Sequence, residues 1–223
     1  MTSATLIAMY RIMEKTKEPK KRETYHHGDL RAQLIEATRL LVEEKGPDHF
    51  SISEACRKAG VSTAAPYRHF KHKDEILLAV TKAGLDRKYA RMVAAVEAQP
   101  KGSLERIVAL GQVYVGFARD EPGVFRLIFG NTRHHKMHDG LMDDGPRHYG
   151  FVEAEVAAYL GRTEPDDDVK ERAFMLWTCV HGLSFLLLDE KVSVTGGAID
   201  LDRLLYRVAD SVMNSGEPVS IKD

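Results

Sequence analysis

The sequence contains only two cysteines, Cys56 and Cys179, among its 223 residues. Two cysteines are too few for a disulfide framework, so a reducing compartment is the simpler prediction. Long hydrophobic runs are also missing, because the richest one, Leu183–Leu188, is far shorter than the about 20 residues that cross a bilayer. The N-terminus lacks a basic segment followed by an apolar core, which argues against secretion. These absences predict a cytoplasmic protein without a membrane partner.

Motifs of catalysis and of cofactor binding are missing as well. The sequence has no glycine-rich phosphate loop, no GxSxG elbow and no carboxylate-rich metal box. The acidic run Asp166–Asp168 is more typical of a surface segment that begins a helix than of a catalytic site. The sequence therefore predicts that the protein is not an enzyme and has no cofactor.

A group of histidines suggests a metal site at first sight. His134, His135, His138 and Asp139 lie in a loop rich in His, Asp and Gly, predicted over residues 131–146. They lack the regular helical spacing of a zinc site such as HExxH. Histidines grouped in a loop are usually solvated, so the sequence favours no metal, with a loop metal site as the alternative.

The charge is unevenly distributed along the chain, although the formal net charge is only −1. Residues 1–73 hold 14 Lys and Arg against 9 Asp and Glu, whereas residues 74–223 hold 18 against 24. DNA phosphates respond to the local charge within about a Debye length, roughly 10 Å, and not to the total. A basic end often marks no more than a solvated face, so this asymmetry permits DNA binding without proving it.

Apolar periodicity, interrupted by proline and glycine, predicts an all-α fold. We expect an N-terminal three-helix helix-turn-helix domain, followed by a larger helical bundle that binds an effector and dimerises. The domains are predicted as a flexible basic arm over residues 1–24, a reader domain over 25–73 and the bundle over 74–223. Helices are expected at about 30–46, 51–60, 62–70, 74–99, 103–120, 121–130, 146–160, 168–190 and 200–214.

The segment Ser51–Lys73 has the features of a helix-turn-helix. Ser51 and Glu54 form a capping-box pattern, and Gly60 can take the left-handed conformation that ends a helix. The small side chain of Cys56 suits the close crossing of two helices. The B-DNA major groove, about 12 Å wide, admits one helix, so the second helix would enter it by its small N-terminal residues. The alternative is a plain helical hairpin with solvated charges.

Several stretches of this sequence strongly resemble the TetR/AcrR family of bacterial regulators. In the reader they are Tyr25–Arg31, Ala59–Ser62, and Tyr67–Phe70 with Lys73–Glu75. In the bundle, the stretch Glu121–Leu127 resembles the short middle helix of the family. Trp177 with His181–Gly182 resembles the WHG type of C-terminal domain. Pro66 departs from the family, in which a leucine is common, and it affects the expected start of the reading helix.

The resemblance implies a role for each matching position. It implies a homodimer formed by the last two helices, which binds a near-palindromic double-stranded DNA operator. The strongly apolar helix around Leu176–Leu188 independently needs both a core and a partner to cover it. Tyr67 and Lys73 would grip phosphates. The residues expected on DNA are Ser53, Thr63, Ala64, Ala65, Tyr67, Arg68, His69 and Lys73.

Members of the family usually release DNA when a small molecule enters the C-terminal bundle, so the resemblance implies a ligand-responsive repressor with an apolar or aromatic effector. Aromatic residues at helical spacing are often plain core, and His181 is equally compatible with a buried histidine bonded to backbone. A structural or nucleoid-type DNA binder without an effector is the alternative, and a solid bundle would favour it. The predicted effector residues are Tyr114, Phe117, Phe125, Phe129, Phe151, Trp177 and His181.

Overall fold

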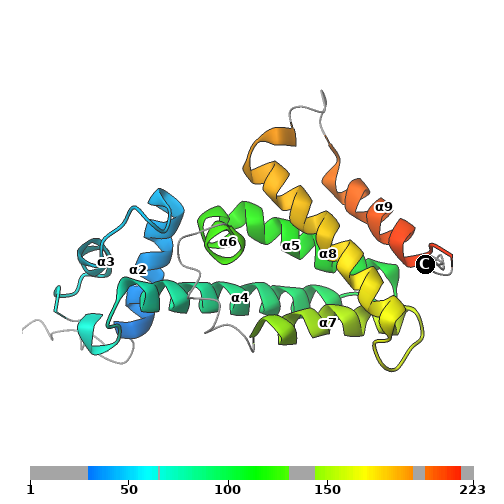
Figure 1. Ribbon diagram of the computed structural model, residues 1–223, viewed down its shortest axis with the longest axis horizontal. Coiled ribbons are helices and arrows are strands. Elements are labelled where there is room, and N and C mark those ends of the chain that lie inside the picture. Colours follow the sequence, from blue (N-terminus) through cyan, green and yellow to red (C-terminus); the bar gives the residue numbers. More distant parts are fainter. Residues whose placement is uncertain (1–29, 65, 131–143, 193–198, 217–223) are drawn as a thin grey trace, which may run out of the picture. The chain divides into compact units, whose positions relative to one another are not determined.

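The computed structural model describes residues 30–64, 66–130, 144–192 and 199–216, and the account below concerns the compact unit that begins at Arg31. Within these residues every regular element is helical, which confirms the predicted all-α fold (Figure 1). The proposed arm, residues 1–24, lies outside the described residues. The elements are α2 (Leu30–Lys45), α3 (Ile52–Ala59), the 3₁₀ helix η2 (Pro66–Arg68), α4 (Lys73–Glu97), α5 (Leu104–Asp120), α6 (Pro122–Phe129), α7 (Asp144–Tyr159), α8 (Asp167–Leu188) and α9 (Leu201–Met213).

The start and the end of α3 follow the local signals in the sequence. The Ser51 hydroxyl accepts the backbone N–H of Glu54, and the Glu54 carboxylate accepts the backbone N–H of Ser51 at 2.8 Å, so the capping box is complete. Gly60 has φ +69°, and the N–H of Val61 bonds to the carbonyl of Cys56 at 3.0 Å. This left-handed ending confirms the predicted role of Gly60. Cys56 is fully buried beneath it.

The expected third helix, residues 62–70, is wrong in its form. The structure has turns at Thr63 and Ala64, followed by the 3₁₀ helix η2. Pro66 is the physical reason, since it has no N–H to donate and its ring excludes a regular α-helix through the residues before it. The carbonyl of Pro66 then accepts the N–H groups of both His69 and Phe70 at 2.8 Å. The reading segment is therefore a compact turn anchored by the buried Pro66 and Phe70.

The bundle is organised around α5, which contacts α4, α6, α7, α8 and α9. In Figure 1, α4 runs along α5 on one side, with α8 and α9 on the other. A buried aliphatic cluster joins Ile107 of α5 to Val156 of α7, Ala173 of α8 and Val212 of α9. None of the helices in the described part of the chain is long and apolar enough to cross a membrane.

Candidate DNA-reading segment and effector cavity

The predicted reading residues lie on the surface of the reader. Thr63 and Ala64 are exposed at the start of the segment, and Tyr67 is 63% exposed. Ser53 on α3 is exposed, as are Arg68 and His69, whereas Ala65 lies outside the described residues. Free hydroxyl, guanidinium and imidazole groups on one short segment are able to donate to phosphates and to base edges. Their contact with DNA stays a prediction.

Lys73, the expected phosphate contact, already has partners within the protein. Its ammonium donates to the carbonyls of Asp48 at 3.2 Å and Phe50 at 3.0 Å. It also lies 4.3 Å from the centre of the Phe50 ring, within the range of a cation–π contact. Lys73, the first residue of α4, therefore ties the start of this helix to the segment before α3, a structural role that the sequence did not predict.

The bundle contains a partly open cavity of about 400 Å³ with a largely apolar lining. This size falls within the range of small-molecule sites, roughly 300–1,000 Å³. Three of the predicted effector residues line it: Tyr114 of α5, Phe129 of α6 and Trp177 of α8. Most of the other lining side chains are aliphatic and come from α4, α5, α7, α8 and α9. The bundle is therefore not solid.

Four of the predicted effector residues are not among the residues that line this cavity. Phe117 is 1% exposed and Phe125 is fully buried, and both pack in the layer behind Tyr114. Phe151 packs edge-on against Tyr89, next to a small buried cluster of α4 and α5. Phe117 and Phe125 are core residues, whereas Phe151 is partly buried at the edge of that cluster. Helical spacing alone does not separate a ring that packs in the core from one that faces a space.

His181 is the fourth predicted effector residue that does not line the cavity. It contacts a lining residue, Tyr114, from behind. Its Nδ1 lies 2.8 Å from the Tyr114 hydroxyl, and the Trp177 Nε1–H donates to that hydroxyl oxygen at 3.3 Å. An indole can only donate, so the Tyr114 proton remains available for His181. Burial, and to a smaller extent the charge of Lys88, lower the pKa of His181, which favours the neutral ring that accepts it. Trp177 and His181, one helical turn apart, thus orient Tyr114 together.

Lys88 of α4 is a lining residue that the sequence analysis missed. It is 6% exposed, and burial lowers its pKa to about 8. Its Nζ lies 5.0 Å from the centre of the Tyr114 ring and 5.3 Å from that of Phe129. Leu85, Lys88 and Met92 all line the cavity. Their spacing of three and four residues places them on the same face of α4. In the sequence, this spacing was the signal that Lys88 lies on the apolar face of its helix.

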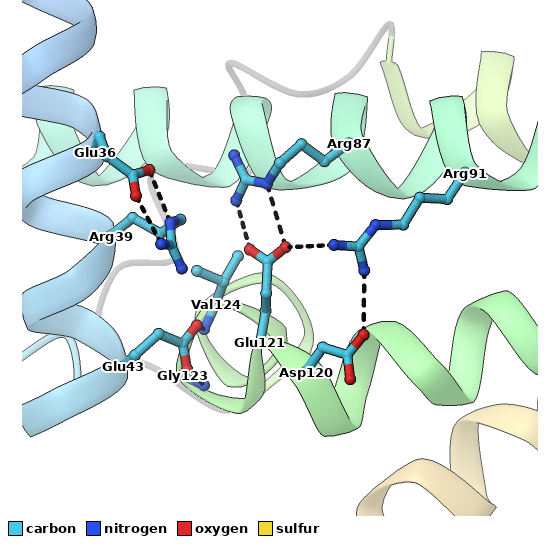
Figure 2. Close-up of polar contacts among 9 residues, drawn as sticks. All are labelled: Glu36, Arg39, Glu43, Arg87, Arg91, Asp120, Glu121, Gly123 and Val124. Carbon is cyan, nitrogen blue, oxygen red and sulfur yellow. Dashed lines mark hydrogen bonds and ion pairs between the residues drawn. The ribbon is translucent and has the colours of Figure 1, made fainter.

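Helix α6 connects the cavity to the reader, and Figure 2 shows this junction. The Glu43 carboxylate of α2 accepts the backbone N–H groups of Gly123 at 2.7 Å and Val124 at 3.0 Å. These N–H groups belong to the first turn of α6 and have no partner within their own helix. At the other end of the same short helix, Phe129 lines the cavity. A single helix therefore contacts both the reader and the candidate effector site.

A buried carboxylate holds α4 to the start of α6 beside this junction. Glu121 is 5% exposed, and the Arg87 guanidinium binds it through two hydrogen bonds of 2.5 and 3.2 Å (Figure 2). Arg91, one turn further along α4, lies 3.7 Å from Glu121 and 3.4 Å from Asp120. Paired donors of this kind fix the orientation of the carboxylate as well as its charge. Helix α4 thus presents Lys88 to the cavity and Arg87 to the junction.

The predicted metal group cannot be placed, because His134, His135, His138 and Asp139 lie outside the described residues. Within the part that the structure describes, no three His, Cys, Asp or Glu side chains gather closely enough to hold a metal ion.

Both the reader and the bundle match known protein families. Residues 34–80 match the model of bacterial regulatory proteins of the tetR family, and residues 107–212 match a tetracyclin repressor-like C-terminal domain. The two matches together cover about two thirds of the chain. The chain carries both domains of the TetR family. It belongs to the TetR family of bacterial regulatory proteins, and the finer WHG assignment stays a prediction.

Among curated proteins, this TetR-family chain is 29% identical over 134 residues to the nucleoid occlusion factor SlmA of Alteromonas mediterranea, covering 60% of the chain and 62% of that protein. The chain thus spans about three fifths of the length of that relative. A solved protein of unknown function from Rhodococcus sp. RHA1 is 27% identical, with a TM-score of 0.71 over 86% of this chain and 97% of that one. A transcriptional regulator from Saccharomonospora viridis in complex with choline shares the fold, at 21% identity and a TM-score of 0.64 over 82% and 95% of the two chains.

Proposed function

We propose that this protein is a ligand-responsive repressor, which binds a palindromic operator as a homodimer and releases it when a small apolar or aromatic molecule fills the cavity. The observation that carries the proposal is helix α6, which lines the cavity with Phe129 and binds the reader through Glu43. An occupant that displaces Phe129 also shifts the N-terminus of α6. The reader then moves with Glu43.

The energy that such a switch requires is modest. An effector that prefers the DNA-incompetent state by about 1–3 kcal/mol lowers operator affinity by roughly 5- to 150-fold. A ligand that buries its apolar surface in a largely apolar cavity of about 400 Å³ gains enough free energy to supply a preference of this size. The route through α6 adds a second connection to the long helix α4 (Lys73–Glu97), which joins the reader to the bundle.

The proposed homodimer uses the outer face of α8 and α9. Large apolar side chains are exposed there: Met175 is 45% and Leu186 48% exposed on α8, and Tyr206 is 49% exposed on α9. Met175 and Leu186 lie three turns apart and share a stripe with Cys179 and Gly182. Large exposed apolar faces of this kind mark association surfaces, which supports a dimer through this pair of helices.

Two measurements test the dimer. Met175→Glu and Leu186→Glu should shift sedimentation toward the monomer and abolish specific DNA binding, because each places a charge in the proposed interface. Leu40→Glu is the matched control, since Leu40 is 39% exposed but lies on α2. A Leu186→Glu variant that remains dimeric would remove this interface from the proposal.

A nucleoid-type DNA binder without an effector is the second candidate, and it is supported by the similarity to SlmA, which is named as a nucleoid occlusion factor. Such a protein needs no cavity, and a solid bundle would have favoured it. The cavity lined by Tyr114, Phe129 and Trp177 favours the ligand-responsive repressor instead.

A cationic effector is disfavoured by the same cavity. The Saccharomonospora protein was solved with choline, a quaternary ammonium ion. In this chain the Lys88 ammonium already lies against the rings of Tyr114 and Phe129, the groups that would otherwise attract such a cation. A second positive charge beside Lys88 would be repelled.

Trp177 makes the proposed switch measurable. It is the single tryptophan of the chain and lines the cavity, so its fluorescence reports occupancy. Apolar compounds that change this fluorescence should release the DNA upstream of the protein's own gene in a band-shift assay. Val108→Phe, which fills the cavity from α5, is the control and should bind DNA without responding. Compounds that bind near Trp177 and leave DNA affinity unchanged would contradict the proposal.

A further inference from the structure

The cavity contains one charge that its apolar walls do not balance. Lys88 is the only charged side chain among the described residues that line it. The ammonium has no hydrogen-bond or ion-pair partner in the described part of the chain, and the ring faces of Tyr114 and Phe129 are its nearest compensation. A largely buried ammonium without an anion is unfavourable, because buried charges are normally paired.

The other titratable groups around Lys88 offer no anion. Tyr114 faces it from α5, His148 and Tyr149 line the same cavity from α7, and His181 lies behind Tyr114 on α8. Burial raises the pKa of Tyr114 further above its ordinary value, so its hydroxyl stays neutral. The pKa of His181 is lowered, so this ring is neutral as well. The cavity therefore combines an apolar volume with one desolvated positive charge.

We propose that the effector is an apolar carboxylic acid, whose carboxylate pairs with Lys88 and whose hydrocarbon part fills the space between Tyr114, Phe129 and Trp177. This inference rests on the proposed role of the cavity as the effector site and names the class of its ligand. The acid supplies the charge that Lys88 lacks. The ion pair forms between largely apolar walls, where charge-assisted hydrogen bonds are stronger than in bulk water.

The position of Lys88 also connects this ligand to the junction. Arg87, the adjacent residue of α4, binds Glu121 at the start of α6. Phe129, at the end of α6, lies against the Lys88 ammonium. A carboxylate that draws Lys88 toward itself changes the contact with Phe129, so α6 responds to the acid and not only to the filling of the cavity.

The test compares ligands that share a shape and differ in charge. Decanoic acid, decanamide and decyltrimethylammonium are titrated against the full-length protein at pH 7, with Trp177 fluorescence as the readout. We expect decanoic acid to bind roughly tenfold or more tightly than decanamide, the increment typical of one charge-assisted contact. Decyltrimethylammonium should bind more weakly than both.

A substitution assigns this preference to Lys88. Lys88→Met keeps the length of the side chain and removes the charge, so decanoic acid should lose its advantage while decanamide still binds. Lys82→Met, on the exposed side of α4, is the matched control and should keep the preference. Should Lys88→Met fail to fold, a pH titration of the wild-type protein tests the same point. Its preference for decanoic acid over decanamide must decrease as the pH rises above about 8, because Lys88 loses its proton there.

The outcomes separate this inference from the proposed function. Binding of decanamide as tight as that of decanoic acid would overturn the acid class but leave an effector cavity. Tighter binding of decyltrimethylammonium would replace the acid by a cation. If hexanoic, octanoic, decanoic and 4-phenylbutyric acids all leave Trp177 fluorescence unchanged, the acid proposal fails. If the neutral and cationic probes fail too, the cavity loses its role as an effector site.

Discussion

Glu43 of α2 binds Gly123 of α6 across 80 positions of sequence, with its carboxylate 2.7 Å from the Gly123 nitrogen. The neighbouring Val124 N–H is bound by the other oxygen of the same carboxylate. A negative group at the N-terminus of a helix accepts hydrogen bonds from the free N–H groups, and it also interacts favourably with the helix dipole. The reader is thereby held to the helix that lines the cavity, and this contact can be broken by one substitution.

Glu43→Ala should uncouple the two domains without removing either. It leaves the Gly123 and Val124 N–H groups without their acceptor, so their amide hydrogens should exchange faster, and effector binding should no longer change DNA affinity. Glu44→Ala is the control, because Glu44 pairs with Lys58 on the reader surface. Hydrogen exchange and band-shift assays with and without ligand measure the two effects. A Glu43→Ala variant that responds like the wild type would exclude α6 as the route.

Gly123 is required by the closeness of α2 and α6. A Cβ at this position would lie 2.5 Å from the Val42 carbonyl oxygen and 2.9 Å from the Glu43 Cα, both backbone atoms. Gly123→Ala should therefore force the two helices apart and lower the free energy of unfolding by about 1–3 kcal/mol.

Gly116→Ala provides the comparison, since a Cβ there meets nothing within 4 Å. In a helix interior this change should be neutral or stabilise by up to about 1 kcal/mol. Urea unfolding of both variants measures the difference. Equal stabilities would mean that the junction is loose enough to accept a methyl group.

Lys88 should make the stability of the protein depend on pH. Its pKa falls from 10.5 to about 8 on folding, because burial disfavours the charged form. Between these values the unfolded chain holds a proton that the folded chain has lost, so stability rises with pH in this range. Below pH 8 the full cost of burying the charge remains.

Lys88→Met should therefore raise the free energy of unfolding by roughly 1–3 kcal/mol at pH 7, since each unit of pKa shift is worth about 1.4 kcal/mol. This gain should shrink as the pH rises toward 10.5. Lys82→Met, on the exposed side of the same helix, should show no such trend. Parallel stability–pH profiles for wild type and Lys88→Met would show that the ammonium is hydrated in the folded protein.

Local signals in the sequence predicted the reader better than the cavity. The capping box of Ser51 and Glu54 and the left-handed Gly60 depend on neighbouring residues, so their geometry follows from a few positions. Pro66 was expected to affect only the start of the reading helix, but turns and the 3₁₀ helix η2 replace that helix, because the proline has no N–H to donate and its ring excludes a regular α-helix through the residues before it.

The cavity depends on contacts between distant helices, which periodicity does not provide. Tyr114 and Phe125 both lie on apolar faces, and only the packing of α5, α6 and α8 decides that Tyr114 faces the space while Phe125 fills the core. Lys88 was missed because lysine on a charged helix is ordinarily solvated. Gly123 was noticed as part of a family motif, but its reason, the close approach of α2, is visible only in three dimensions.

Lys73 has a structural role and a predicted contact with a DNA phosphate, and separate measurements on Lys73→Ala distinguish the two. Lys73→Ala removes two hydrogen bonds to the carbonyls of Asp48 and Phe50, and with them the contact with the Phe50 ring. We expect a loss of about 1–2 kcal/mol in the free energy of unfolding. Lys71→Ala, at an exposed position two residues earlier, should leave stability unchanged.

The predicted phosphate contact of Lys73 is measured separately, at a temperature where both variants are folded. If Lys73 neutralises a phosphate, Lys73→Ala lowers the dependence of log affinity on log salt by about 0.9 for each protomer and weakens binding to all DNA sequences alike. A full salt dependence combined with reduced stability would show that the ammonium stays on its two carbonyls in the complex. Lys73 would then position the reading segment, and Tyr67 and Arg68 would have to supply the phosphate contacts.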